Sequence, residues 1–283
     1  MKREEVTELV ERGIGELSEA LAAGKSDRLK EYLAMMARFP RYSFNNTLLI
    51  LLQNPDARMV QGFHAWKKLG RTVIRGQKGI GIIAPMVGKK RDSDSSQSEG
   101  SRASDDGEKK IFGFKVVHVF DVAQTEGDEL PDVAGVTGEP GPYIDAIEEL
   151  IYEWEIELVY EVIEGGADGL SKKGAIVISP DLEPAKRLLT LIHEVAHEAM
   201  HGDPERRKQT TKTIRETEAE AVAFVVASAL GIDCLGHSLD YIQLYNGDAE
   251  VLAMSLDAIQ KASSQILDGI HKNTSAIESE AVA

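Results

Sequence analysis

The sequence has one cysteine, few aromatic residues and no long apolar run, and each scarcity excludes a class of protein. Cys234 alone can form neither an internal disulfide nor a cysteine-based zinc cluster, which fits a reducing cytosol. The longest apolar run, 221–232, is shorter than the roughly 20 residues of a membrane-spanning helix. The charged first residues lead into no apolar stretch of the kind found in a secretory signal. We therefore expect a cytoplasmic protein that does not contact a membrane.

The composition predicts a folded chain of two domains. Its 283 residues are 42% hydrophobic and 28% charged, which excludes a wholly disordered chain. At roughly 100–200 residues per domain, two domains are expected. Because glycine and proline cluster at 126–142, we place the boundary there, with a first domain at 1–130, a second at 140–270 and a flexible tail at 271–283.

The net charge of −15 conceals opposite charges in the two halves. Residues 1–127 contain 21 Lys and Arg against 17 Asp and Glu, whereas the rest contains 11 against 30. The positive excess is greatest at 28–91, with 13 basic and two acidic residues. Unless this basic face is merely solvated, it predicts an anionic partner for the first domain and different work for the second. The acidic domain should repel a DNA backbone and can attract a basic protein substrate.

Hydrophobic periodicity and turn residues predict an α+β fold. In the first domain, they predict helices at 6–21, 26–37, 45–53 and 62–68, then two short strands at 72–74 and 80–84 that form a hairpin. Residues 88–110 hold no large apolar residue, so we expect a disordered insert before the strand at 111–122. The second domain is predicted to have a helix at 143–154, strands at 157–162 and 175–179, helices at 184–200 and 213–230, and a helix pair at 248–270.

The most informative motif is His193-Glu194-Val195-Ala196-His197. On a helix, residues four apart lie on one face, so both imidazoles can bind a single Zn²⁺ ion, of which we expect one per chain. Glu194 can then act as the general base for a water molecule activated by that ion. A site of this chemistry also accepts Mn²⁺ or Fe²⁺. The alternative is a pair of core histidines satisfied by hydrogen bonds, but apolar neighbours make such a buried pair costly without a partner.

A catalytic zinc site needs a third protein ligand, and the sequence offers two candidates. His201 follows His193 by eight residues, about 12 Å along a straight helix, so it can join the site only if the helix breaks first. The other candidate is Glu216 on the next helix, which shares a face with Glu220. In that arrangement Glu216 binds the metal and Glu220 supports a ligand histidine. Alternatively the glutamates form a solvated helix start, an interpretation that suits Glu218 best.

These motifs resemble known families. His193-Glu194-x-x-His197 followed by Glu216-x-x-Ala219-Glu220 resembles the ImmA/IrrE-type zinc metallopeptidases, which implies a zincin-like second domain with Glu216 as third ligand. Glu220 stands where that family usually has Asn or Asp. The stretches 41–49, 62–70, 73–79 and 116–125 are similar to the N-terminal domain of ArdC-type antirestriction proteins. That family joins a single-stranded-DNA-binding domain to a metallopeptidase-like domain and occurs on plasmids and phages.

Cationic and aromatic residues of the first domain support single-stranded DNA as its partner, because such strands are bound by a basic groove and by rings that stack on bases. Trp66 is as readily explained as a core residue, and Ser43 and Asn46 as capping or turn residues. The candidate DNA-binding residues are Arg41, Tyr42, Ser43, Asn46, Phe63, Trp66, Lys67, Lys68, Arg71, Arg75 and Lys78.

We therefore expect a mobile-element antirestriction-type protein that binds single-stranded DNA and cleaves an unknown protein with a zinc-dependent peptidase domain. One alternative is a DNA-coating protein without turnover, whose metal is structural. Another is a regulatory peptidase that cleaves a repressor and uses DNA binding as a sensor.

Overall fold

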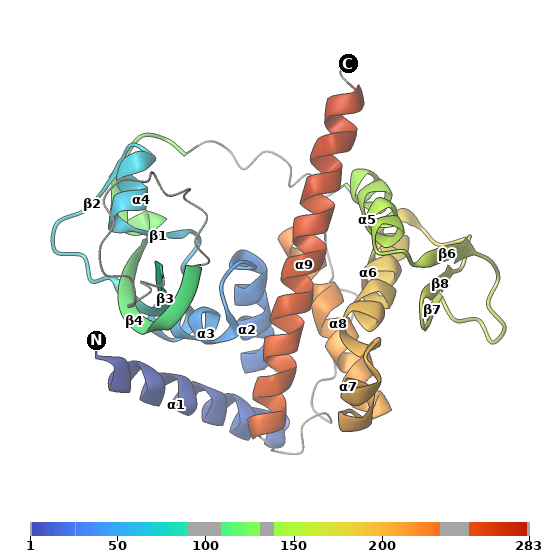
Figure 1. The fold of residues 1–283 in the computed structure, drawn as a ribbon, viewed down its shortest axis with the longest axis horizontal. Coiled ribbons are helices and arrows are strands. Elements are labelled where there is room, and N and C mark those ends of the chain that lie inside the picture. The colour runs from blue at the N-terminus through green and yellow to red at the C-terminus, as the bar shows by residue number, and fades with distance from the viewer. Residues whose placement is uncertain (1, 26, 90–108, 131–138, 233–248, 282–283) are drawn as a thin grey trace, which may run out of the picture.

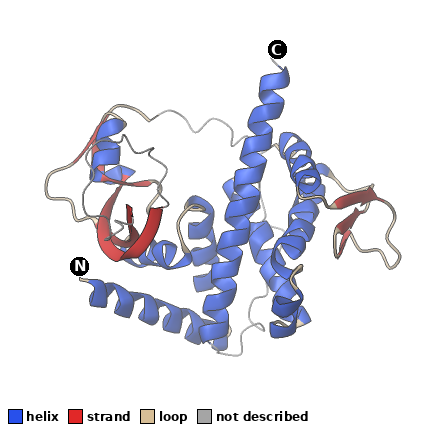
Figure 2. Cartoon of the chain, viewed as in Figure 1, coloured by secondary structure: helices blue, strands red, loops and turns tan. Residues whose placement is uncertain are grey.

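The computed structural model describes residues 2–25, 27–89, 109–130, 139–232 and 249–281. Within these ranges the fold is α+β, as the sequence predicts (Figure 2). Most of the disordered insert expected at 88–110 lies outside the described residues, as does Cys234. No described helix has both the length and the apolar character that crossing a bilayer requires.

Helices form most of the described chain, and most follow the predicted periodicity. The α1 stripe of Val6, Val10, Leu17 and Leu21 is buried, as steps of three and four residues require. The helices are α1 (Arg3–Ala22), α2 (Asp27–Arg38), α3 (Phe44–Gln53), α4 (Phe63–Lys68), α5 (Gly141–Glu153), α6 (Pro184–His201), α7 (Pro204–Gln209), α8 (Lys212–Ala229) and α9 (Ala249–Ala281).

The strands form three small sheets. The first, of order β1-β4-β3, is antiparallel and contains β1 (Val60–Gly62), β3 (Ile80–Lys89) and β4 (Lys109–Asp121). The second pairs β2 (Arg71–Val73) with β5 (Thr125–Gly127), which follows the short 3₁₀ helix Val122–Gln124. The third, of order β6-β8-β7, contains β6 (Glu157–Tyr160), β7 (Gly169–Lys172) and β8 (Ala175–Ile178), and leaves β7 at an edge.

The hairpin predicted from 72–74 and 80–84 is wrong. All ten residues of β3 pair with β4, whereas β2 pairs with β5 in another sheet. The connection between β2 and β3 is fixed by Gln124, whose side chain donates to the Lys78 carbonyl and whose own carbonyl accepts from Ile74 N–H. The turn residues at 75–79 thus connect strands of two different sheets. The longer ladder with β4 determines the partner of β3.

The expected helix pair and flexible tail at the C-terminal end are replaced by one helix, α9, of 33 residues. Its glycine, Gly269, does not end the helix, because Leu150 of α5 packs so closely that an added Cβ would lie 2.5 Å from the Leu150 side chain. Beyond the expected end, Asn273 is buried and donates to the Ala146 carbonyl of α5. These contacts with α5 keep the segment after 271 helical.

A single hydrophobic core joins the helices of both halves. Leu33 of α2, Leu48 of α3, Ile192 of α6, Val222 of α8 and Leu256 of α9 belong to the same buried cluster. Figure 1 shows α9 running lengthwise between α1–α3 with the first two sheets on one side and α5–α8 on the other. The division into domains at 1–130 and 140–270 stays a prediction, and any such domains share this core.

Candidate metal centre

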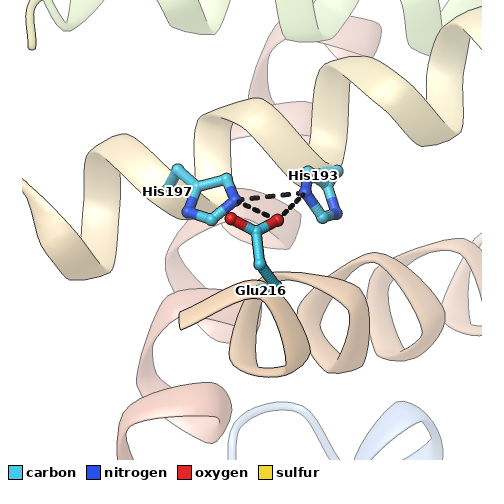
Figure 3. A group of neighbouring side chains, drawn as sticks. All are labelled: His193, His197 and Glu216. Atoms are coloured by element: carbon cyan, nitrogen blue, oxygen red, sulfur yellow. Dashed lines mark hydrogen bonds and ion pairs between the residues drawn. The ribbon is translucent and has the colours of Figure 1, made fainter. Parts of the chain in front are cut away.

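Two packed helices, α6 and α8, bring together the residues that the sequence nominated as metal ligands. His193 and His197 lie one turn apart on α6, and their Nε2 atoms are 3.1 Å apart. Glu216 projects from the first turns of α8, and its Oε2 lies 3.7 Å from His193 Nε2 and 3.6 Å from His197 Nε2 (Figure 3). The three side chains converge on one point between the helices.

The spacing of these three atoms fits a divalent cation. In a tetrahedral site with metal–ligand bonds of about 2.1 Å, the ligand atoms lie about 3.4 Å apart. The edges of 3.1, 3.6 and 3.7 Å bracket that value. Both imidazoles are largely buried, whereas the Glu216 side chain is half exposed, so one side of the group is open to solvent. Two neutral imidazoles and one carboxylate on an open face form the donor set of a catalytic metal site.

The electrostatic interactions among His193, His197 and Glu216 favour a bound cation. The imidazoles of His193 and His197, whose Nε2 atoms lie 3.7 and 3.6 Å from Glu216 Oε2, hold the pKa of Glu216 far below its usual range. Burial favours the neutral imidazole of His193, but Glu216 and the nearby charges of Glu194 and Glu220 outweigh it and raise the pKa of His193. The carboxylates thus place negative potential where the two imidazole nitrogens converge, which favours a positive ion there.

Glu194 is fixed beside the group by the edge strand β7. Its side chain is buried, the backbone N–H of Ser171 donates to it, and burial raises its pKa above the ordinary value. Gly169 admits the carboxylate, because a Cβ there would lie 2.7 Å from Glu194 Oε1. A carboxylate with a raised pKa takes up and releases a proton more readily near neutral pH, as a general base requires.

The second candidate ligand, His201, has a different place. Helix α6 continues through His201, whose buried ring points away from Glu216 toward Glu218 of α8. His197 Nδ1 lies 3.2 Å from His201 Nδ1, and His201 Nε2 lies 2.8 Å from Glu218 Oε2. Glu218 also accepts from Arg206, at 2.8 Å. If His197 binds a metal through Nε2, its Nδ1–H donates to His201 and the His201 Nε2–H donates to Glu218.

This chain of hydrogen bonds corrects the expectation for Glu218. Glu218 is fully buried rather than solvated, and although burial opposes its charge, hydrogen bonds from His201 and Ser255 lower its pKa. Glu220 lines a cavity of about 190 Å³ together with His193, and its charge is among those that raise the pKa of that histidine, so its support of a ligand histidine stays a prediction. His201, one turn further along α6, supports His197 and is itself bonded to Glu218. The periodicity of α8 alone does not predict this role of Glu218.

Four of the expected DNA-binding residues are engaged within the fold. Trp66 is fully buried, and its Nε1 donates to the Phe120 carbonyl at 2.8 Å. Asn46 exchanges two hydrogen bonds of 2.8 Å with the backbone of Ile83, which satisfies the free edge of β3. Tyr42 is half-buried and donates to the Val60 carbonyl, and Arg71 donates to Thr125 and the Asp128 carbonyl. Local pattern could not separate these structural roles from ligand contacts.

The other candidates are exposed. Ser43 occupies the N-cap position of α3 without a side-chain capping bond, and Arg41 forms a 3.3 Å ion pair with Asp268 of α9. Lys67 Nζ lies 5.1 Å from the centre of the Phe63 ring. The residues of this set that present their side chains to solvent without an ion pair among the described residues are Phe63, Lys67, Lys68, Arg75 and Lys78.

Sequence reasoning overlooked an exposed apolar surface on the β3–β4 ladder. Phe112 is 62% exposed and Phe114 48% exposed, and Met86, Val87 and Ile111 are exposed as well. Met86 pairs with Gly113 and Val87 with Ile111, so Phe112 is the extra residue of a β-bulge, and alternation in the sequence alone does not place its ring.

Two family models match this sequence, one in each half of the chain. Residues 3–120 match the family model described as the N-terminal domain of anti-restriction factor ArdC, and residues 155–234 match that of the IrrE N-terminal-like domain. The chain combines the two domains of an ArdC-type protein. The resemblance seen in the motifs is thereby confirmed, and the IrrE-like domain contains the complete His193–His197–Glu216 group.

Relatives of this ArdC-type chain agree in overall fold. Crystal structures of the antirestriction ArdC protein from plasmid R388, metal-free and Mn(II)-bound, each align with a TM-score of 0.54 and 16% identity. They cover 95% and 94% of this chain and 98% of their own. An uncharacterized Bacillus anthracis protein, pXO2-81, is 24% identical over 98% of the chain, which spans about half (53%) of that relative.

Proposed function

We propose that the chain is a metal-dependent peptidase of the zinc type. The observation that carries the proposal is the convergence of His193, His197 and Glu216 within 4.8 Å of one another, beside the buried carboxylate of Glu194. The match to the IrrE-like domain supports the same reading, and the Mn(II)-bound structure of a relative supports a divalent cation. Imidazole and carboxylate ligands accept Zn²⁺, Mn²⁺ or Fe²⁺, with Zn²⁺ favoured by this ligand set.

The chain's own groups have separate roles in peptide hydrolysis. His193, His197 and Glu216 would hold the ion, which when bound supplies Lewis acidity toward a peptide carbonyl and toward water. Glu194 takes the proton from the attacking water and delivers it to the nitrogen of the leaving amine. The Ser171 N–H keeps that carboxylate in place. The free edge of β7 offers backbone groups on which an extended peptide can lie.

Glu194→Gln and His197→Ala test this function together. Elemental analysis of the purified protein should find about one metal ion per chain in the wild type and in Glu194→Gln, and none in His197→Ala. Cleavage of a peptide library, read by mass spectrometry, should occur only with the wild type. Cleavage by Glu194→Gln at the wild-type rate would contradict the proposed base. If Glu194→Gln still protects DNA from restriction in cells, the alternative of DNA coating without turnover is favoured.

We propose single-stranded DNA as the partner of the first half, as the match to the ArdC N-terminal domain suggests. The specific observation that favours it is the pair of exposed rings on β4, Phe112 and Phe114, in a half of the chain with an excess of basic residues. Each stacked base contributes about 1–3 kcal/mol. Phe112→Ala with Phe114→Ala should therefore weaken binding of a fluorescent oligothymidylate at least tenfold in an anisotropy titration.

The control for this titration is Tyr152→Ala, which removes a ring that is 77% exposed on α5, in the other half of the chain. Equal losses in the double variant and in this control would contradict a stacking surface on β4. Together, the two proposed activities support an antirestriction role, the role for which the R388 protein is named.

A further inference from the structure

A second cavity, of about 250 Å³, adjoins the metal centre, and Glu220 is not part of its wall. Its wall contains His193, Glu194, His197 and Glu216, so whatever occupies it lies against the reacting groups. The rest of the wall comes from β7 with the turn that follows it, from α7 and from the start of α8. The cavity is therefore part of the place where a substrate would sit.

This cavity collects positive charge in a half of the chain that is otherwise strongly acidic. Residues 128–283 contain 11 Lys and Arg against 30 Asp and Glu. Four of those 11 line this cavity: Lys173, Arg207, Lys212 and Arg215. Only three of the 30 acidic residues do so, and these are Glu194, Glu198 and Glu216. The ratio of charges at the cavity is thus inverted relative to the half that contains it.

The acidic side chains of the wall already have partners, whereas most of the basic ones do not. Glu198 accepts from the Ser171 hydroxyl and from Gly174 N–H, and Glu216 interacts with the two histidines. Lys173, Arg207 and Lys212 form no ion pair or side-chain hydrogen bond among the described residues. Unmatched cations around a concave surface focus a positive potential into it.

Arg215 fixes this wall. Its guanidinium donates to the Thr210 carbonyl at 2.6 Å and to the Arg207 carbonyl at 3.4 Å, which ties the start of α8 to the end of α7. It is half-buried, in contrast to the exposed side chains of the other three. The wall is thus a positioned group of cations on two helices and one turn.

We propose that this cavity binds an acidic side chain of the substrate, an Asp or Glu within a few residues of the bond to be cleaved. The inference rests on the proposed peptidase function, and it specifies the substrate class of that site. It also reverses the expectation from net charge, which favoured a basic substrate. The 190 Å³ cavity has a different wall, in which Leu189, Ala223 and Phe224 accompany Glu220 and the paired Asp168 and Lys186.

The test measures peptide binding separately from cleavage. The probes are fluorescein-labelled ten-residue peptides, identical except for a central pair that is Asp-Glu, Asn-Gln or Lys-Lys. Anisotropy titrations use the full chain carrying Glu194→Gln, loaded with Zn²⁺, so that no probe is consumed. Two charge-assisted contacts should make the Asp-Glu peptide bind at least about tenfold tighter than the Asn-Gln peptide. The Lys-Lys peptide should bind weakest.

Matched variants show whether the cavity is responsible. Replacing Lys173, Arg207 and Lys212 by Ala should abolish the preference for the Asp-Glu peptide. The control replaces their neighbours Lys172 and Lys208, which are exposed but lie outside the cavity wall, and should keep it. Zinc content and circular dichroism of both variants should match the parent. An Asp-Glu peptide that binds no tighter than Asn-Gln, or a preference that survives the triple substitution, overturns the proposal.

Further outcomes distinguish an acidic-peptide subsite from a phosphate site, and the subsite from the peptidase function. If an oligothymidylate displaces the Asp-Glu peptide at equal or lower concentration, and the triple variant loses that competition, the cavity is a phosphate site and the peptide assignment is wrong. If the acidic preference is found but the Zn²⁺-loaded wild type cleaves none of the peptides, the subsite stands and the peptidase function fails. Cleavage without acidic preference gives the reverse conclusion.

Discussion

His201 provides the most discriminating single substitution, because its role follows from geometry that the sequence could not supply. Replacing it by Ala removes the acceptor for His197 Nδ1–H and the donor to Glu218 Oε2, contacts of 3.2 and 2.8 Å. His201 is 2% exposed and Glu218 is fully buried, so water does not replace the lost partners at the surface. The substitution thus acts on metal binding and on stability by separate routes.

The expected loss of metal affinity is about 10–100-fold, the usual effect of removing a residue that orients a ligand histidine. Glu216→Ala should cost far more, because it removes a proposed ligand. The expected loss of stability is about 2–4 kcal/mol, the lower part of the range of about 2–6 kcal/mol that follows from about 1–3 kcal/mol for each of the two buried polar groups left with one partner fewer. Arg206 still pairs with Glu218 in the variant, which keeps the estimate below that for a fully isolated buried charge.

The two effects are measured separately. Zinc affinity comes from competition with a chromogenic chelator, and stability from urea unfolding of the metal-free protein. His64→Ala, which removes an exposed histidine remote from α6, serves as the control and should change neither quantity. Loss of zinc from His201→Ala as complete as from His197→Ala would mean that His201 is itself a ligand. An unchanged zinc affinity would refute the proposed support of His197.

Four other substitutions have expected outcomes that urea unfolding or cleavage assays check. Trp66→Ala should destabilise the protein by about 3–5 kcal/mol, whereas Phe63→Ala should leave stability almost unchanged, because only Trp66 is buried. Asn46→Ala should cost about 1–3 kcal/mol, since both backbone groups of Ile83 lose their partner. Gly169→Ala should lower peptide cleavage while zinc content stays near one per chain, because its Cβ displaces Glu194; wild-type cleavage would contradict this.

The part of the centre that lies within one helix could be predicted from the sequence. Two histidines four residues apart on α6 must share a face, and the structure brings their Nε2 atoms to 3.1 Å. Glu216 was nominated as one of two candidates, and its position opposite both histidines depends on how α8 packs against α6. The contact between His201 and Glu218 depends on the same packing, so the sequence assigned His201 and Glu218 other roles.

The fold shows the same division between local and non-local information. The helices can be predicted from periodicity, because apolar residues that recur at steps of three and four define the buried face of each helix. The strand that pairs with β3 cannot be predicted in this way, because the turn residues at 75–79 are compatible with either sheet. The long ladder with β4 determines the pairing. Likewise, the close packing of Gly269 against the side chain of Leu150, more than a hundred residues away, is a contact that local sequence does not predict.

Net charge predicts the partner of a whole surface but not that of one cavity. The 30 acidic residues of the second half set its average potential, and that average suggested a basic substrate. A bound peptide experiences mainly the charges within a Debye length, about 8–10 Å at physiological salt. Near the metal centre these charges include Lys173, Arg207 and Lys212, none of them paired among the described residues. The substrate preference should therefore follow the local excess of positive charge, and it should weaken as added salt shortens the screening length.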